Sequence, residues 1–181
     1  KAAVHFSLDV AKKTILIIGG SQGARSINQA ILAGLDRILE QGVQVIWQTG
    51  IAFESTAKQA ADGQPNLYVS AFIYEMDLAY AMADVVISRA GASSVSEICL
   101  TGKASILVPL PSAAEDHQTE NAKSLVSQHA AILVRDTDVK EKLVSTALDA
   151  LRSDLSAFEK NSLKLAKPNA AHEIAQSILH A

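Results

Sequence analysis

Short apolar runs alternate with longer segments of helical periodicity along this chain, and that alternation constrains the fold more than any other feature. The runs have no polar face, which is typical of strands buried between two layers of helices. Right-handed crossovers between such strands produce a doubly wound, Rossmann-like α/β fold around a parallel sheet. Strands are predicted at residues 14–18, 43–48, 67–70, 84–88, 105–109 and 131–134.

The segments between these strands show the spacing of amphipathic helices. In the first, Ile27, Ile31 and Leu35 lie on one helical face. The length of 181 residues fits one domain, and residues 1–13 read as a tail leading into the first strand. Helices are predicted at residues 24–41, 53–61, 76–83, 94–101 and 116–128 and from Asp138 onward, with a final segment from Pro168 to His180.

Composition narrows the classes of function. The net charge of -3 carries no electrostatic signature of nucleic-acid binding. No apolar run approaches the roughly 20 residues that span a bilayer, and residues 1–13 lack the apolar core of a signal peptide. Cys99 is the only cysteine, so the chain has no internal disulfide, and the cytosol is its natural compartment. Its apolar neighbours predict a buried structural thiol.

The first informative loop is Gly19-Gly20-Ser21-Gln22-Gly23-Ala24, which follows the first strand. In doubly wound sheets, ligands bind outside the carboxyl ends of the strands. Glycines let the backbone approach a ligand, and the following helix start is a ready anion site. A tight turn with Ser21 as N-cap is the alternative. The glycine spacing matches neither the dinucleotide fingerprint nor the Walker A motif.

The second loop, residues 88–94, follows the fourth strand and repeats the pattern of glycine, small residues and hydroxyls before a helix. Two such loops could hold a diphosphate from both sides. Glu97 lies one turn into the helix, where a carboxylate can accept hydrogen bonds from a ribose diol. The alternative is a capping box of Ser94 with Glu97, which needs no ligand. Arg89 is either a phosphate ligand or part of a structural ion pair.

The third loop runs from Pro109 to Asn121, after the fifth strand. His117 and Asn121 share one face near a helix start, and the amides of Gln118 and Asn121 suit sugar hydroxyls. A solvated helix start capped by Asp116 is the alternative. His117 has no orienting carboxylate in sequence, which argues against a catalytic base.

A pair of aspartates, Asp136 and Asp138, is the one place where the sequence invites a metal–diphosphate interpretation. They lie between a strand and a helix, where Asp is a favoured N-cap, and we interpret them as caps. No cluster of His, Cys and Glu suggests another metal site, and no metal or other cofactor is predicted. The chain has no G-x-S-x-G serine-hydrolase elbow.

Taken together, the three loops resemble the MurG-type UDP-N-acetylglucosamine transferases of peptidoglycan synthesis. The likeness covers residues 14 to 133 approximately. The first matching motif is Gly-Gly-Ser-Gln-Gly-Ala-Arg at residues 19–25, together with Asn28. The second is Ser-Arg-Ala-Gly-Ala at residues 88–92, together with Ser94 and residues 96–98. The third comprises 109–111, Glu-Asp-His-Gln at 115–118 and Asn121-Ala122. Phe72-Ile73, Met76 and 83–87 also look like the family.

The resemblance implies the carboxy-terminal, donor-binding half of a GT-B glycosyltransferase. Residues 14–181 would be the UDP-sugar-binding domain, and residues 1–13 a linker or tail from a missing amino-terminal domain. By position, the backbone of Ile73 would meet the uracil, Glu97 the ribose hydroxyls and Gln118 the sugar. The implied substrate-binding residues are Ser21, Gln22, Gly23, Ile73, Arg89, Gly91, Ala92, Ser94, Glu97, His117, Gln118 and Asn121.

The implied reaction is inverting transfer of N-acetylglucosamine from UDP to a muramoyl-pentapeptide on undecaprenyl diphosphate, at the cytoplasmic membrane face. The catalytic base, the acceptor site and the peripheral membrane contact would lie in the missing domain. This chain would therefore bind UDP-N-acetylglucosamine and transfer nothing alone.

Three alternatives remain open on the sequence. One is another GT-B UDP-sugar enzyme, such as an epimerase or a lipid glycosyltransferase. Another is an NAD(P)-binding domain, although no acidic residue lies close after the second strand to hold a ribose. The last is a non-catalytic interaction module, which would have no nucleotide affinity.

Overall fold

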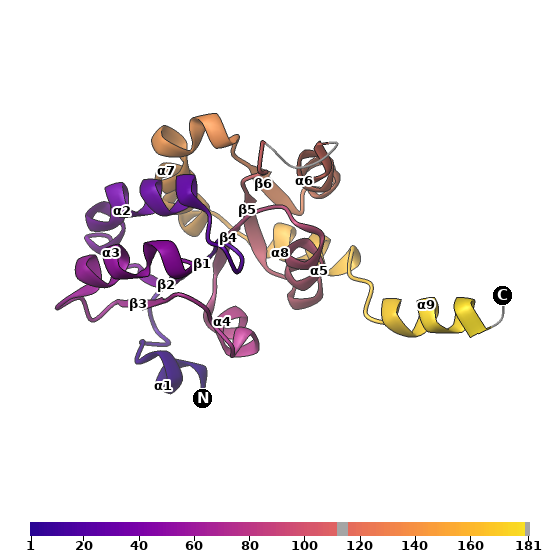
Figure 1. Ribbon diagram of the computed structural model, residues 1–181, viewed down its shortest axis with the longest axis horizontal. Coiled ribbons are helices and arrows are strands. Elements are labelled where there is room, and N and C mark those ends of the chain that lie inside the picture. Colours follow the sequence, from indigo (N-terminus) through magenta and orange to yellow (C-terminus); the bar gives the residue numbers. More distant parts are fainter. Residues whose placement is uncertain (112–115, 180–181) are drawn as a thin grey trace.

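A six-stranded sheet, parallel throughout, forms the centre of the computed structural model, which describes residues 1–111 and 116–179 (Figure 1). The strand order is β3-β2-β1-β4-β5-β6, so the predicted doubly wound α/β fold is confirmed. Glu115 and His180, which belong to predicted segments, lie outside the described residues. The strands are β1 (Thr14–Ile18), β2 (Gln44–Gln48), β3 (Leu67–Ser70), β4 (Val85–Ser88), β5 (Ala104–Leu107) and β6 (Ala131–Leu133).

Helices follow the strands as the periodicity predicts, with ends that shift by a few residues. The predicted helical stretch after Asp138 is divided into three helices, separated by breaks at residues 153–155 and 165–169. The helices are α1 (Ala2–Phe6), α2 (Arg25–Leu39), α3 (Ile51–Ala61), α4 (Met76–Met82), α5 (Ala92–Thr101), α6 (His117–Ser127), the short 3-10 helix η2 (Asp136–Asp138), α7 (Val139–Arg152), α8 (Ser156–Lys164) and α9 (Ala170–Leu179).

Both faces of the sheet are buried, because side chains along a strand alternate between two cores. Ile15 and Ile17 of β1 pack with α2, α3 and α7 in one core, whereas Leu16 and Ile18 pack with α1, α4, α5 and α6 in the other. Cys99 is buried in the second core as predicted, and burial raises the pKa of its thiol.

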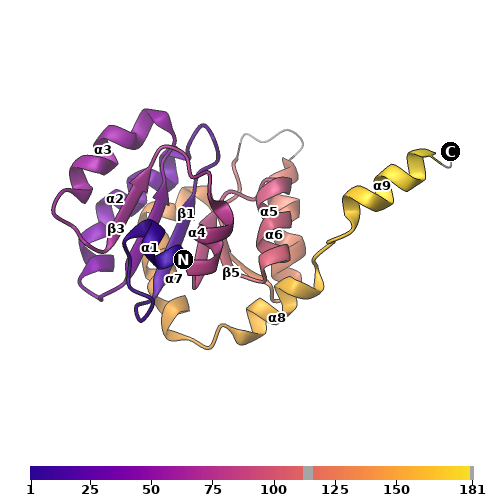
Figure 2. The same ribbon diagram turned by 90° about the horizontal axis from the view of Figure 1, so that it is seen from below.

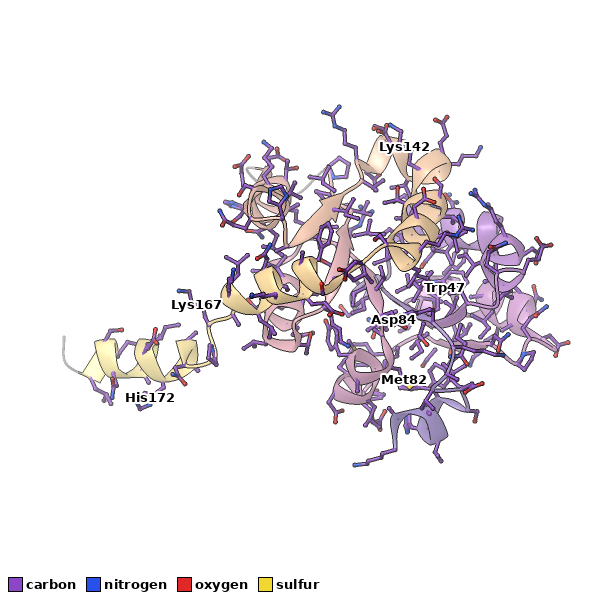
Figure 3. All side chains as sticks on the ribbon, turned by 180° about the vertical axis from the view of Figure 1, so that it is seen from behind. Trp47, Met82, Asp84, Lys142, Lys167 and His172 are labelled. Atoms are coloured by element: carbon purple, nitrogen blue, oxygen red, sulfur yellow. The ribbon has the colours of Figure 1, made fainter. Side chains whose placement is uncertain are left out.

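A buried polar network ties α2 to β2 within the first core. Trp47, which is wholly enclosed in the body of the domain, donates from Nε1 to Asn28 Oδ1 at 3.0 Å (Figure 3). Asn28 Nδ2 in turn donates to the Thr49 carbonyl at 2.8 Å. An unpaired buried amide or indole N–H is unfavourable, so this network fixes the start of α2 against the end of β2.

The two ends of the chain differ in their packing. Phe6 of α1 is buried and meets the ring of Tyr68 in β3 edge to face at 4.9 Å, so α1 packs against the domain, although most of residues 1–13 are exposed. Their origin as an interdomain linker remains a prediction. Helix α9 instead projects away from the rest of the domain and has no buried residue (Figure 2). Among the described residues, no helix has both the length and the apolar character to cross a membrane.

Candidate functional site

The carboxyl edge of the sheet brings the three predicted loops together. Strands β1 and β4 are neighbours, and their connections lead to opposite halves of the sheet, which makes their carboxyl ends a topological switch point. Doubly wound sheets bind ligands in the crevice at such a point. The glycine loop of residues 19–24 follows β1 and the Arg89–Gly91 loop follows β4, so the two small-residue loops flank the crevice.

Backbone contact between two loops explains part of the glycine pattern. Gly23 has a φ of 77°, and a side chain there would overlap the Thr49 carbonyl. Gly50, with a φ of 74°, approaches so closely that an added Cβ would lie 2.5 Å from the Gly23 nitrogen. These glycines are therefore required by packing between the loops after β1 and β2. Gly91 differs, because an added Cβ would meet nothing within 4 Å.

Each of the three predicted loops leads into a helix that begins at this edge without a side-chain cap: α2 after Ala24, α5 after Gly91 and α6 after Asp116. Their first-turn N–H groups and positive helix ends suit an anion. The alternative that Ser21 is an N-cap is wrong, because α2 begins four residues later. The Ser94–Glu97 capping box is also wrong, because extended Gly91 starts α5 at Ala92 and places Ser94 inside the helix.

The Glu97 carboxylate accepts a hydrogen bond from a side chain of α4. The buried Tyr80 hydroxyl, from α4, donates to Glu97 Oε2 at 3.1 Å, while the Glu97 side chain is exposed. Burial, and then the neighbouring carboxylate, raise the pKa of Tyr80, so it stays a neutral donor. One carboxylate oxygen is thus held in place while further acceptor positions face outward.

Arg89 lies in a side-chain network. Its guanidinium contacts Asp136 Oδ1 at 2.6 Å and donates to the carbonyls of Val108 and Pro109, each at 3.2 Å. It also donates to Ser26 Oγ at 3.0 Å, and that hydroxyl donates to Asp136 at 2.6 Å. The ion pair left open by the sequence is therefore present, and contact of Arg89 with a phosphate remains a prediction.

The two aspartates that we interpreted as caps, Asp136 and Asp138, have different roles in the structure. Asp138 is the N-cap of α7 by position and contacts Lys142 at 2.9 Å. The cap interpretation is wrong for Asp136, which lies inside η2 after the N-cap Arg135 and belongs to the Arg89 network. Neither makes a side-chain capping bond. Within residues 1–111 and 116–179, no group of three or more His, Cys, Asp or Glu side chains could hold a metal ion.

The third loop joins the site through its amides. Gln118 Oε1 accepts from the Leu110 N–H, and Asn121 Nδ2 donates to the Ala90 carbonyl, both at 3.0 Å. Asn121 thus ties α6 to the loop after β4. His117 is exposed at the first position of α6. Asp116 is the N-cap by position, but its carboxylate accepts from the Thr119 hydroxyl.

Ile73 lies in the segment after β3 and is buried, with its N–H donating to Gln48 Oε1 at 3.0 Å. Sequence reasoning missed Gln48, although a polar residue ending an otherwise apolar strand was a usable signal. It also missed Tyr80 and Ser26, whose partners lie far away in sequence. Gln22 and Gly23 line a pocket of about 380 Å³ on one flank of the edge.

Residues 14–178 match the model of the glycosyltransferase family 28 C-terminal domain. The UDP-N-acetylglucosamine–N-acetylmuramyl-(pentapeptide) pyrophosphoryl-undecaprenol N-acetylglucosamine transferase of Bacteroides thetaiotaomicron is 49% identical over 180 residues. That alignment covers 96% of this chain and 48% of the relative. The chain therefore spans about half the length of the curated relatives it matches.

Solved structures give the same picture. A crystal structure of MurG from Acinetobacter baumannii matches with a TM-score of 0.79 and 30% identity, over 99% of this chain and 53% of that one. The carboxy-terminal CMP-Kdo-binding domain of WaaA from the same organism matches with a TM-score of 0.63 and 13% identity, over 90% of this chain and 93% of that one. At that identity, the second likeness indicates a shared fold alone.

Proposed function

This chain belongs to the glycosyltransferase family 28 C-terminal domain family, and from that membership we propose that it binds UDP-N-acetylglucosamine as the donor half of a peptidoglycan transferase. The fold is that of the carboxy-terminal halves of GT-B glycosyltransferases. The observation that carries the proposal is the position of two helix starts, those of α2 and α5, on either side of the β1/β4 switch point.

In this proposal, each part of UDP-N-acetylglucosamine contacts a different loop at the carboxyl edge of the sheet. The diphosphate lies between the glycine loop and Gly91-Ala92, with Ser21 and Gln22 beside it. The uracil meets the segment around Ile73, and Glu97 accepts from the ribose hydroxyls. Gln118, with His117 and Asn121 nearby, meets the sugar. Support comes from placement, since these residues all lie on the loops and helix starts of one sheet edge.

Stabilisation of the leaving group is the chemical contribution of this half. When the bond to the sugar breaks, negative charge builds on the UDP diphosphate. Preorganised N–H donors at the starts of α2 and α5 stabilise that charge without reorganisation, and such donors are worth several kcal/mol each in buried sites. The acceptor hydroxyl's proton goes to a base that we place in the other half of the whole protein.

The acceptor is the lipid-linked muramoyl-pentapeptide, which binds to that other half of the protein. The same half contacts the cytoplasmic face of the membrane. In this proposal, residues 1–13 are the linker or tail that joins the donor-binding domain to that other half. Under this proposal, the isolated chain binds donor but forms no product from donor and acceptor. Product formation by this chain alone would contradict the placement of the base.

The NAD(P) alternative shares the strand order, so the fold does not decide against it. The residues at the end of β2 argue against it. Gln48 is followed by Thr49 and Gly50, and the next carboxylate along the chain, Glu54 of α3, is paired with Lys58. An epimerase or another UDP-sugar transferase would use a similar edge, and sugar selectivity separates those enzymes from this one.

Calorimetric titration of the chain tests the proposal. We expect saturable binding of UDP-N-acetylglucosamine, weaker binding of UDP-N-acetylgalactosamine and none of NAD. Glu97→Ala should weaken binding of both UDP-sugars, and Gln118→Ala should remove the preference between them.

Exposed residues away from the edge supply matched controls: Asp149→Ala, near the end of α7, and Gln59→Ala, near the end of α3, should bind like wild type. Binding of NAD without binding of UDP-sugars would refute the proposal.

A further inference from the structure

Gln48 lies at the carboxyl end of β2, with only 3% of its surface exposed. Its side-chain amide contacts two different loops. Oε1 accepts from the Ile73 N–H at 3.0 Å, and Nε2 donates to the Gly20 carbonyl at 3.3 Å. The amide therefore bridges the glycine loop after β1 and the segment after β3, which are separated by about 50 residues of chain.

We propose that Gln48 is a positioning residue for the nucleotide: it holds the glycine loop and the Ile73 segment in the relative arrangement that one UDP molecule requires. This inference rests on the proposed function, in which the diphosphate meets the first of these segments and the uracil the second. A single nucleotide that contacts both segments at once binds best when the offset between them is already fixed, and Gln48 sets that offset.

Other contacts hold only some of these loops together. The Gly50 N–H donates to the Ala71 carbonyl and the Thr49 N–H to the Ser70 carbonyl, each at 3.0 Å, which joins the loops after β2 and β3. Gly23 packs on Gly50 through backbone atoms. Gln48 adds hydrogen bonds from a single side chain to both the first and third loops.

Loss of the amide would leave the buried Ile73 N–H without its acceptor, and the Gly20 carbonyl would keep only the Gly23 N–H as a donor. Both changes favour loop conformations in which these groups reach water. The ligand would then have to order both segments on binding, at the expense of affinity.

The same strand supplies a matched control. Gln44 lies four residues earlier on the same face of β2 and is 1% exposed. Its amide accepts from the Asp9 N–H at 2.7 Å and donates to the Asp9 carbonyl at 2.8 Å. These contacts lie at the amino edge of the sheet, away from the proposed site. Gln44→Met and Gln48→Met therefore remove comparable buried hydrogen bonds, only one set of which joins ligand loops.

The experiment compares these two variants with wild type in two measurements. Amide hydrogen exchange of the free chain should show faster exchange at Ile73 and in the glycine loop for Gln48→Met, and wild-type exchange there for Gln44→Met. Calorimetry with UDP-N-acetylglucosamine should show affinity about tenfold lower for Gln48→Met and unchanged for Gln44→Met.

A further variant guards against loss of folding in Gln48→Met. Burial disfavours the charged form of a carboxyl group, so we use Gln48→Glu near pH 5. Its protonated side chain retains an acceptor for the Ile73 N–H and a donor to the Gly20 carbonyl, so exchange and affinity should match wild type at that pH.

The outcomes separate the two proposals. Binding by wild type and equally by Gln48→Met would overturn the positioning role and leave the donor assignment intact. Equal loss of affinity in Gln44→Met and Gln48→Met would also overturn it, since general destabilisation would then explain both. Absence of binding by wild type would overturn the donor assignment itself, and the nucleotide role of Gln48 with it.

Discussion

The hydroxyl of Tyr80 donates to Glu97 Oε2 across 3.1 Å, joining a buried side chain of α4 to an exposed one of α5. An exposed glutamate normally samples several rotamers, and ordering it on ligand binding is unfavourable. Tyr80 supplies that order in advance, so the carboxylate that we assign to the ribose is preorganised by a residue that does not itself reach the ligand.

Tyr80→Phe should lower the affinity for UDP-N-acetylglucosamine by about fivefold, the size expected for one modest hydrogen bond. Calorimetry measures this directly. Tyr68→Phe is the control, because the Tyr68 ring packs in the same core and its hydroxyl makes no hydrogen bond within the described part of the chain. Equal effects of the two substitutions would show that Tyr80 does not act through Glu97.

Alkaline pH should destabilise the domain through the same tyrosine. The pKa of Tyr80 is raised in the folded state above its ordinary value of 10.0, first by burial and then by Glu97. Its contribution to stability is complete below pH 10 and is lost as pH rises further, because only the unfolded chain then releases the proton. The free energy of unfolding should fall by about 1.4 kcal/mol per pH unit from this group.

Urea unfolding between about pH 9 and pH 11 measures that slope. Tyr80→Phe should reduce it, whereas Tyr74→Phe should not, because Tyr74 is 83% exposed. An unchanged slope in Tyr80→Phe would contradict the assignment.

Gly91→Ala should separate a ligand requirement from a structural one. Gly91 has a φ of -66° and open space around an added Cβ, so the folded domain tolerates alanine there. We expect a change in unfolding free energy within about 0.5 kcal/mol, together with clearly weaker UDP-N-acetylglucosamine binding. Unchanged binding would argue against close approach of the diphosphate to Gly91.

Alanine substitutions at two other glycines give reference values for the change in unfolding free energy. Gly23→Ala should destabilise the domain by more than about 2 kcal/mol, through a positive φ and overlap with Thr49. Gly20→Ala has a similar φ and no overlap, so it should destabilise by only about 1 kcal/mol.

Arg89→Ala should lower the free energy of unfolding by about 2–3 kcal/mol, because it leaves the largely buried Asp136 carboxylate without its cation. A double-mutant cycle with Asp136→Ala should give a coupling of about 1–3 kcal/mol. If Arg89 acts through this pair, both single variants lose donor affinity alike. A loss confined to Arg89→Ala would identify a direct phosphate ligand.

The fold was accessible from the sequence because apolar periodicity is a local signal. All six strands and the helices between them follow from runs such as Thr14–Ile18. The three loops could also be placed, since carboxyl ends of parallel strands share one edge. Helix starts were less secure: Ser94 and Glu97 have capping-box spacing, yet Gly91 starts α5 earlier.

Side-chain partners could not be predicted, because they depend on tertiary distances. Arg89 and Asp136 are 47 residues apart, and spacing gave no reason to pair them. Gln48 was hidden for a related reason, since its two partners are backbone groups in loops on different sides of β2.

The open turn at Gly63 carries a practical consequence. It connects α3 to β3 at the amino edge of the sheet, is exposed, and has nothing within 4 Å of an added Cβ. Exposed loop tips of this kind accept inserted peptides. A short tag or a fluorescent label placed there would immobilise or report on the domain from the edge opposite its proposed donor loops.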